Sequence, residues 1–305
     1  MDASIVVCTY NRSGSLGETI DAICGLDVPG GIRHEVIIVD NNSTDQTAEV
    51  VRPYLDRYGY IRYVFEEKQG LSNARNRGIA ESRGATILFT DDDVLPERDW
   101  LVQTLDGMAK HGADACGGFI SPIFETPPPA WLTARFHGFL AVRDARTDDY
   151  VIAKPADAPF GANMAFRRQV FDRVGPFDTS RGRKGNTLAS GEDGELFDRL
   201  LRAGIKAVFL GRSRVRHKVE AYRLEKRYFR RWRYQTSRNI AFSKGIPGTR
   251  RLFNVPHYFI VQTARSAFRA LIARLTRPED EAFMQEIILW HFLGTIRGLV
   301  EARRK

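Results

Sequence analysis

The first 120 residues alternate between two hydrophobic patterns. One is a short, β-branched apolar run, which is typical of a strand, and the other places apolar residues at helical spacing. The strand-like runs are Ser4–Thr9, His34–Asp40, Ile61–Glu67 and Ala85–Asp91. The helix-like segments are Gly14–Leu26, Thr44–Arg57, Ser72–Ser82 and Arg98–Lys110. This alternation predicts an α/β fold, with a mostly parallel sheet sandwiched by helices.

The order changes at a proline-rich stretch, Glu125–Trp131. A second portion with strand-like and helix-like runs follows, including KAVFLG and SGEDGELFDRLLRAG. Beyond Ala221 the pattern is helical. The helices expected there are Tyr222–Lys244, Val255–Leu275 and Pro278–Arg303. We therefore predict an α/β domain over residues 1–220 and a helical C-terminal region over residues 221–305.

Each of the four predicted strands ends on polar residues, in the stretches TYNR, DNNSTD, EEKQG and TDDD. The carboxyl ends of parallel strands share one edge of the sheet, and ligands of such sheets bind in the crevice beyond it. The sequence therefore predicts a binding site at this edge.

The fourth strand ends on three adjacent aspartates, Asp91, Asp92 and Asp93. Their like charges repel one another, and a hard cation such as Mg²⁺ or Mn²⁺ would relieve that repulsion. Mg²⁺ typically takes one or two protein carboxylates and completes its shell with water and phosphate oxygens. The alternative is a turn with a helix cap, for which a single aspartate suffices.

The other strand ends carry groups that suit a nucleoside diphosphate. Asp40 can accept a hydrogen bond from a base or a ribose hydroxyl. The tip after the first strand adds backbone groups, an aromatic ring and a cation, and consists of Thr9, Tyr10, Asn11 and Arg12. Arg75 and Arg77 fall in the first turns of a predicted helix, whose amide-rich end attracts anions. The simpler alternative is that both arginines are solvated surface charges.

A second carboxylate pair, Glu192 and Asp193, precedes an apolar stripe at helical spacing. Two interpretations remain open for this pair. Acidic residues in a first helical turn interact favourably with the helix dipole, and a carboxylate within hydrogen-bond reach of an acceptor hydroxyl can act as a general base.

Composition adds an asymmetry of charge. The net charge is +9, yet the part from Gly211 onward carries 22 lysines and arginines against 7 acidic residues, a net +15, and the preceding part carries −6.

The three cysteines, an odd number, fit free thiols in a reducing compartment. The first predicted strand begins within a few residues of Met1, which argues against a signal peptide. No apolar run reaches membrane-spanning length. We therefore expect a cytoplasmic protein, peripheral at the cytoplasmic membrane face if it meets a membrane.

The basic tail mixes arginine and lysine with aromatic residues, as in KRYFRRWRY. Such a mixture suits an anionic membrane surface, and it also suits nucleic acid. A third interpretation is that the helices pack together and leave a solvated basic face. A carboxylate-rich crevice repels phosphate unless a cation intervenes, so we expect no nucleic acid at the predicted site.

Six stretches together carry a family resemblance: VVCTYNR, VDNNSTDQT, GLSNARNRGI, FTDDD, GAN and GEDGELFDRLLRAG. In order and spacing this set resembles glycosyltransferase family 2, over about Ser4–Leu210. The resemblance implies a GT-A fold and a metal-dependent, inverting transfer of sugar from a nucleotide diphosphate sugar, with a UDP-sugar favoured. The implied acceptor is a hydroxyl of a glycan or lipid-linked molecule in cell-surface polysaccharide or glycolipid synthesis. Residues 1–120 would bind the donor and residues 121–220 the acceptor.

The resemblance also implies residue roles. The metal motif falls on Asp91 and Asp93, with Asp93 as direct ligand and Asp91 also near the ribose or base. His217 falls where related enzymes place a histidine near metal or diphosphate, and Asp193, beside Glu192, falls on the general base. The donor-binding positions are Thr9, Tyr10, Asn11, Arg12, Asp40, Arg75, Asp91, Asp92, Gly161, Ala162 and Asn163.

Two rival functions fit the sequence less well. A nucleotidyltransferase would carry a glycine-rich, lysine-containing phosphate loop near its start, and TYNRSGSLGET contains no lysine. A non-enzymatic nucleic-acid-binding protein would place basic residues, not carboxylates, in the crevice. The glycosyltransferase interpretation accounts for more of the polar strand ends than either rival.

Overall fold

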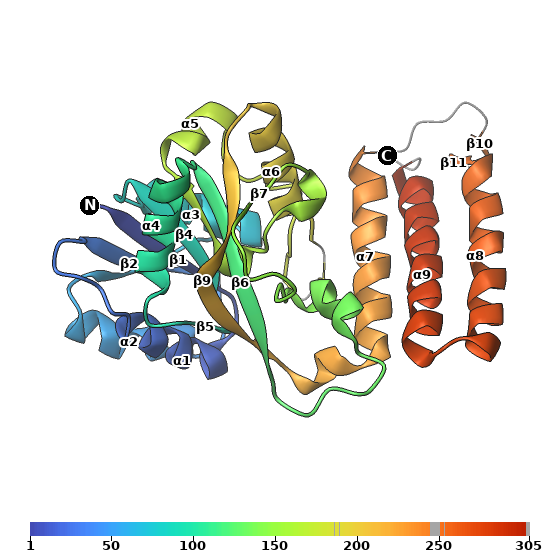
Figure 1. Cartoon of the computed structure of the whole chain (residues 1–305), viewed down its shortest axis with the longest axis horizontal. Coiled ribbons are helices and arrows are strands. Elements are labelled where there is room, and N and C mark those ends of the chain that lie inside the picture. Colours follow the sequence, from blue (N-terminus) through green and yellow to red (C-terminus); the bar gives the residue numbers. More distant parts are fainter. Residues whose placement is uncertain (186, 189, 245–250, 253, 303–305) are drawn as a thin grey trace. The chain divides into compact units, whose positions relative to one another are not determined.

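The computed structural model describes residues 1–185, 187–188, 190–244, 251–252 and 254–302 (Figure 1). The chain forms two compact units. Unit 1 comprises Met1–Ile123, Ala141–Gly185 and Glu192–Lys218. Unit 2 comprises Phe124–Leu140, Asn186–Gly191 and Val219–Lys305.

Unit 1 begins with alternating strands and helices. In chain order these are β1 (Ala3–Thr9), α1 (Ser13–Cys24), β2 (His34–Asp40), α2 (Thr47–Arg57), β3 (Ile61–Phe65), α3 (Leu71–Glu81), β4 (Thr86–Asp91), β5 (Val94–Pro96), α4 (Trp100–His111) and β6 (Ala115–Phe124). The later elements are β7 (Tyr150–Val151), η2 (Pro155–Asp157), η3 (Gly161–Asn163), β8 (Met164–Arg167), α5 (Gln169–Val174), α6 (Glu192–Arg202) and β9 (Ala207–Val219), where η marks a 3₁₀ turn.

The strands form one nine-stranded sheet in the order β3-β2-β1-β4-β8-β6-β9-β5, with β7 paired to β9. The first four strands in this order are parallel neighbours. Beyond them β8 runs antiparallel to both β4 and β6. The parallel half lies where strands and helices alternate, since a parallel neighbour requires a crossover helix.

Helices cover both faces of this sheet, and the alternating side chains of β1 show how. Ile5 and Val7 point into a core shared with α1, α2 and α4, whereas Val6 and Cys8 point into a core shared with α3, α5 and α6. A strand buried on both faces is continuously apolar, which explains why the run SIVVCT lacks polar alternation. The predicted α/β architecture with a helical C-terminal part is confirmed.

Unit 2 is mainly helical. It contains η1 (Ala134–Leu140), η4 (Ala221–Leu224), α7 (Lys226–Lys244), the short hairpin β10 (Arg251–Leu252) and β11 (Val255–Pro256), α8 (His257–Thr276) and α9 (Glu279–Ala302). In Figure 1 α9 lies between α7 and α8, and it packs on both. Within the described ranges, no helix combines the length and apolar character that crossing a bilayer requires.

An aromatic cluster forms one core of unit 2. Trp131 packs edge-on against Phe136, Phe229 and Phe283, with ring centroids 5.5, 5.3 and 4.9 Å away. These four side chains are buried. Edge-to-face packing at these separations is favourable beyond the apolar area that it buries. The cluster ties the proline-rich segment and η1 to α7 and α9.

Candidate active site

The three aspartates lie where β4 ends and β5 begins. Asp92 and Asp93 are buried, and the antiparallel pairing of β5 with β9 sets Val94 opposite His217. This register brings His217 Nε2 to 3.3 Å from Asp93 Oδ1. Arg12, from the tip after β1, approaches the other Asp93 oxygen at 3.5 Å. The predicted metal-ligating residues Asp93 and His217 therefore lie together.

Burial makes the negative charge of these carboxylates costly. Removal from water, and then repulsion by Asp93, raise the pKa of Asp92 to about 8, although Arg12 acts in the opposite direction. Burial likewise raises the pKa of Asp91. Carboxylates held in this way favour either protons or a cation. A divalent ion with oxygen ligands fits such a donor set.

No trio of histidine, cysteine, aspartate or glutamate side chains is arranged as a metal cage among the residues that the structure describes. Mg²⁺ and Mn²⁺ at phosphate-binding sites need only one or two carboxylates, because substrate and water supply the remaining ligands. The residues present thus fit a metal that binds together with a phosphate-bearing ligand.

The second carboxylate pair lies at the start of α6, as expected. One oxygen of Asp193 accepts a hydrogen bond of 2.6 Å from Arg75, and the other accepts one of 2.9 Å from the Gly161 backbone N–H. Glu192 contacts the same arginine at 3.2 Å, and its second oxygen is buried without a hydrogen-bond partner within the described chain. Burial raises the pKa of Asp193 to about 6, because the opposing effect of Arg75 is incomplete.

Arg75 links the two carboxylate clusters. Its guanidinium is buried, pairs with Asp193 and Glu192, and lies 3.8 Å from Asp91. The sequence predicted a donor contact for Arg75, and the structure places its side chain among protein carboxylates. Arg77, on the opposite side of α3, is a surface cation that pairs with Glu81 at 2.9 Å.

Gly161 makes room for this guanidinium. A β-carbon at Gly161 would lie 1.8 Å from Arg75 Nη2, which no packing adjustment of a few tenths of an ångström can relieve. The next residue, Ala162, is buried and accepts a hydrogen bond from Thr90 through its carbonyl oxygen at 3.0 Å. In the motif GAN, glycine therefore leaves the space that the guanidinium of an arginine from α3 occupies.

Asn163 is engaged entirely within the protein. Its amide nitrogen donates to the carbonyl oxygens of Ser213 at 2.8 Å and Phe119 at 3.1 Å, and its oxygen accepts from Trp100 Nε1 at 2.9 Å. A buried amide with this many partners stabilises the junction of β6, β9 and α4. The structure thus assigns Asn163 these structural contacts, two residues along the chain from Gly161, whose N–H binds Asp193.

The candidate nucleotide-binding residues lie in neighbouring loops that are joined by hydrogen bonds. Asp40 accepts hydrogen bonds from Tyr63 O–H at 2.6 Å and from the Ser43 backbone N–H at 2.8 Å. Asn11 accepts one from the Thr44 N–H at 2.8 Å, so the tip after β1 is tied to the loop after β2. Thr9 is buried at the end of β1, and Tyr10 and Arg12 are partly exposed beside it.

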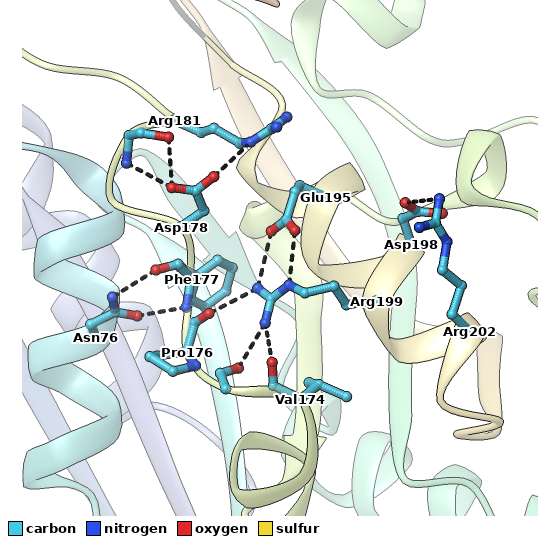
Figure 2. A network of polar contacts seen from close by, with 12 residues as sticks. Asn76, Val174, Pro176, Phe177, Asp178, Arg181, Glu195, Asp198, Arg199 and Arg202 are labelled. Atoms are coloured by element: carbon cyan, nitrogen blue, oxygen red, sulfur yellow. Dashed lines mark hydrogen bonds and ion pairs between the residues drawn. The ribbon is translucent and has the colours of Figure 1, made fainter. Parts of the chain in front are cut away.

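A polar network holds α6 and α3 in place (Figure 2). Arg199 of α6 pairs with Glu195 at 2.8 Å and donates to the Pro176 carbonyl oxygen at 2.8 Å. Asn76 of α3 exchanges two hydrogen bonds with the backbone of Phe177, 2.9 and 2.8 Å long. The guanidinium of Arg75 also lies 5.3 Å from the Phe177 ring centre. The segment 174–181 therefore fixes the relative placement of the two helices.

Two contributors were missed by the sequence analysis. The hydroxyl of Tyr63 engages Asp40, and the positive charge of Arg183 acts on Asp91. Tyr63 lies within the strand-like run IRYVF, and nothing in this local pattern marks it as a partner of Asp40. Arg183 lies in an irregular segment, where no periodicity marks a functional residue.

The chain is similar in sequence to a known protein family and to characterised members of it. The family model described as Glycosyl transferase family 2 matches residues 4–175, more than half of the chain. A glucosyl-dolichyl phosphate glucuronosyltransferase of Haloferax volcanii is 26% identical over 74% of this chain and 72% of that protein. Glycosyltransferase AglE of the same organism is 30% identical over 68% of this chain, which spans only 63% of AglE.

Two further comparisons extend beyond the family match. The succinoglycan biosynthesis protein ExoM of Rhizobium meliloti is 27% identical over 90% of this chain and 84% of that protein. A mannosyltransferase of Pyrobaculum calidifontis, solved with GDP-Man and Mn²⁺, superposes with a TM-score of 0.62. It is 20% identical and covers 98% of this chain and 87% of its own, so this likeness concerns the fold.

The expected GT-A-like fold and the expectation of an enzyme are confirmed, with relatives that act in glycolipid and polysaccharide synthesis. The chain belongs to glycosyl transferase family 2.

Proposed function

We propose that the chain is a metal-dependent, inverting glycosyltransferase that uses Asp193 as its general base. The observation that carries this proposal is the pair of buried carboxylate clusters joined by one arginine, Arg75. One cluster suits a cation with a diphosphate, and the other contains a carboxylate whose pKa lies near 6. A base with this pKa is mostly deprotonated at neutral pH yet still able to accept a proton.

In this mechanism Asp193 accepts the proton of an acceptor hydroxyl while the hydroxyl oxygen forms a bond to the anomeric carbon. The bond between that carbon and the diphosphate oxygen breaks in the same displacement, and the electron pair leaves with the nucleoside diphosphate. The single displacement inverts the anomeric centre. Arg75 and the Gly161 N–H orient the base through their two hydrogen bonds.

Asp93 and Asp91 would hold the divalent ion, with His217 and Arg12 beside them. When bound, Mg²⁺ or Mn²⁺ stabilises negative charge on the departing diphosphate, a Lewis-acid effect worth several kcal/mol. Arg12 and Arg183 bring further positive charge to this edge. Solved neighbours were obtained with Mn²⁺ and nucleotides or nucleotide sugars, which supports this part of the proposal.

The donor proposed is a nucleotide diphosphate sugar, with a UDP-sugar favoured, bound by residues 1–120. Asp40, with Thr9 and Tyr10 nearby, would contact the base and ribose. The acceptor proposed is a hydroxyl of a glycan or lipid-linked molecule, bound by residues 121–220. Relatives named for a dolichyl phosphate substrate and for succinoglycan synthesis support this acceptor class.

The proposal is tested by thermal unfolding with UDP, GDP, ADP and CDP, each with and without Mn²⁺. We expect one nucleoside diphosphate to raise the Tm only when Mn²⁺ is present, because metal and phosphate complete each other's coordination. Asp93→Ala should abolish this shift. Asp193→Asn should retain it, since the amide cannot act as a base but leaves the metal site intact.

Turnover separates the two carboxylates further. With the sugar donor of the nucleotide so identified, Asp193→Asn should reduce the acceptor-dependent release of nucleoside diphosphate by roughly 10²- to 10⁴-fold, the usual contribution of a general base. Arg77→Gln, a change of surface charge on the same helix as Arg75, is the matched control and should leave both readouts unchanged. Unimpaired turnover of Asp193→Asn would show that another group takes the proton.

A further inference from the structure

Helix α8 of unit 2 has two apolar faces. Phe259, Ser266 and Ala273, spaced seven residues apart, are its buried positions, and they belong to the helix that packs on α9. Phe268 is nine residues from Phe259, and Leu275 is nine from Ser266. Nine residues are about two and a half helical turns, so these two side chains point to the opposite side.

That opposite side is an exposed apolar stripe. Its large members are between 41% and 77% exposed, and they are Ile260, Val261, Phe268, Leu271, Ile272 and Leu275. Single exposed apolar residues are common on protein surfaces, but a contiguous row along one helix face marks an interaction site. We call these six residues the α8 stripe.

Arginines border the α8 stripe, and α8 has no acidic residue over His257–Thr276. By helical position, Arg265 and Arg269 lie along one edge and Arg274 lies along the other. No ion pair to any of the three appears among the described residues. The apolar row is therefore bordered by positive charge that no acidic residue of α8 neutralises.

We propose that the α8 stripe is a docking face for an anionic lipid surface, on which α8 lies flat. Apolar side chains would enter the boundary between headgroups and acyl chains, and the flanking arginines would meet lipid phosphates. The helix is about 30 Å long, which suits a position along the surface. The lipid-linked acceptor of the proposed function would make such docking useful. The observations behind the inference come from unit 2 alone.

Charge decides between lipid and the other plausible occupant, a second copy of the chain. Pairing two α8 stripes would set arginine edges against arginine edges without any acid on either helix. An anionic bilayer offers the complementary charge instead. A groove of about 550 Å³ adjoins the stripe, and Phe268, Ile272 and Arg269 line it. Its lining also includes Arg135, Arg277 and one acid, Glu281, so its basic residues outnumber its acidic ones.

The test is co-sedimentation of the full chain with vesicles of phosphatidylcholine alone or mixed with phosphatidylglycerol. We expect binding only to the mixed vesicles and weakening of that binding by salt. Replacing Arg265, Arg269 and Arg274 by glutamine should weaken it about 100-fold, at about fivefold for each arginine. Phe268→Glu and Leu275→Glu should each weaken it roughly tenfold or more.

The control removes three exposed arginines from unit 1, by Arg33→Gln, Arg98→Gln and Arg202→Gln together. It should bind vesicles as the unmodified chain does. Equal binding to both vesicle types, or unchanged binding of the α8 variants, would overturn the proposal. A dimer in solution that Phe268→Glu dissociates would assign the stripe to a second copy. Because vesicle binding requires no nucleotide, its outcome is separate from that of the thermal-shift test.

Discussion

At the scale of single residues, Arg75 has the largest influence on the site. One buried guanidinium compensates the charge of Asp193 and Glu192 and lies near Asp91. A buried arginine with carboxylate partners is costly to desolvate, and it persists only where its contacts repay that cost. Its position therefore favours a role in setting the geometry and the protonation of the proposed base.

We predict that Arg75 sets the pH at which transferase activity falls on the acid side of its pH profile. Asp193 must be deprotonated to act, so activity should rise with pH through its pKa, about 6 in the unmodified protein. Arg75→Ala removes a positive charge that favours the carboxylate form, which should raise this pKa by roughly 1–3 units. The limb should then move to higher pH by the same amount.

The measurement is the pH dependence of nucleoside diphosphate release, together with the Tm. Arg75→Lys keeps the charge and should restore most of the original limb, although lysine lacks the second nitrogen that faces Asp91. If Arg75 acted only on stability, Arg75→Ala would lower the Tm and leave the limb near pH 6. That pattern would contradict a positioning role.

At the scale of elements, the two helices α7 and α9 pack unusually closely. Gly294 and Gly298 of α9 are four residues apart and therefore lie on one face. A β-carbon at either position would come within 2.3 and 2.2 Å of the carbonyl oxygens of Tyr234 and Arg238 in α7. Neither contact is with a flexible side-chain end, so the helices would have to separate.

We predict that Gly294→Ala and Gly298→Ala each destabilise unit 2 by about 1–3 kcal/mol, the usual range for overpacking. Alanine is otherwise the better helix former by about 1 kcal/mol, so a loss would be due to the contact with α7. Gly14→Ala in α1, where no atom lies within 4 Å of the new methyl group, is the control and should be neutral or stabilising. Urea unfolding of the three variants measures the difference, and equal stability of all three would refute close packing.

Elements also show how far the sequence determines the site. The strand ends at Asp40 and Asp91 could be predicted because the apolar runs of β2 and β4 end on these aspartates. Helix starts were less accurate. The segment predicted from Thr44 begins as a helix at Thr47, because Asp45 accepts hydrogen bonds from the Thr47 N–H and the Ser13 N–H and so belongs to the loop.

Contacts between distant segments could not be predicted from local pattern. Arg75 and its partner Asp193 are 118 residues apart, and only the packing of α3 and α6 on one face of the sheet brings them together. The same applies to Gly161, whose importance comes from a side chain that approaches from another element. Local periodicity encodes where each carboxylate emerges, and tertiary packing decides which cation it meets.

At the scale of the whole molecule, the division into two units separates two proposed activities. The carboxylate clusters belong to unit 1, and the α8 stripe belongs to unit 2. Each unit has its own buried core, such as the cluster around Val6 and Phe89 in unit 1 and the one around Ala241 and Leu299 in unit 2. The charge asymmetry of the sequence follows the same division, with the basic excess toward the end of the chain.

We predict that each ligand changes local stability in its own unit, as hydrogen exchange should show. A ligand stabilises the folded segment that binds it, so the identified nucleoside diphosphate with Mn²⁺ should slow exchange around Asp93 and the start of α6. Anionic vesicles should slow exchange in α8. Asp93→Ala should abolish only the first effect, and the triple arginine change in α8 should abolish only the second. Protection of α8 by the nucleotide alone would show instead that the two sites are energetically coupled.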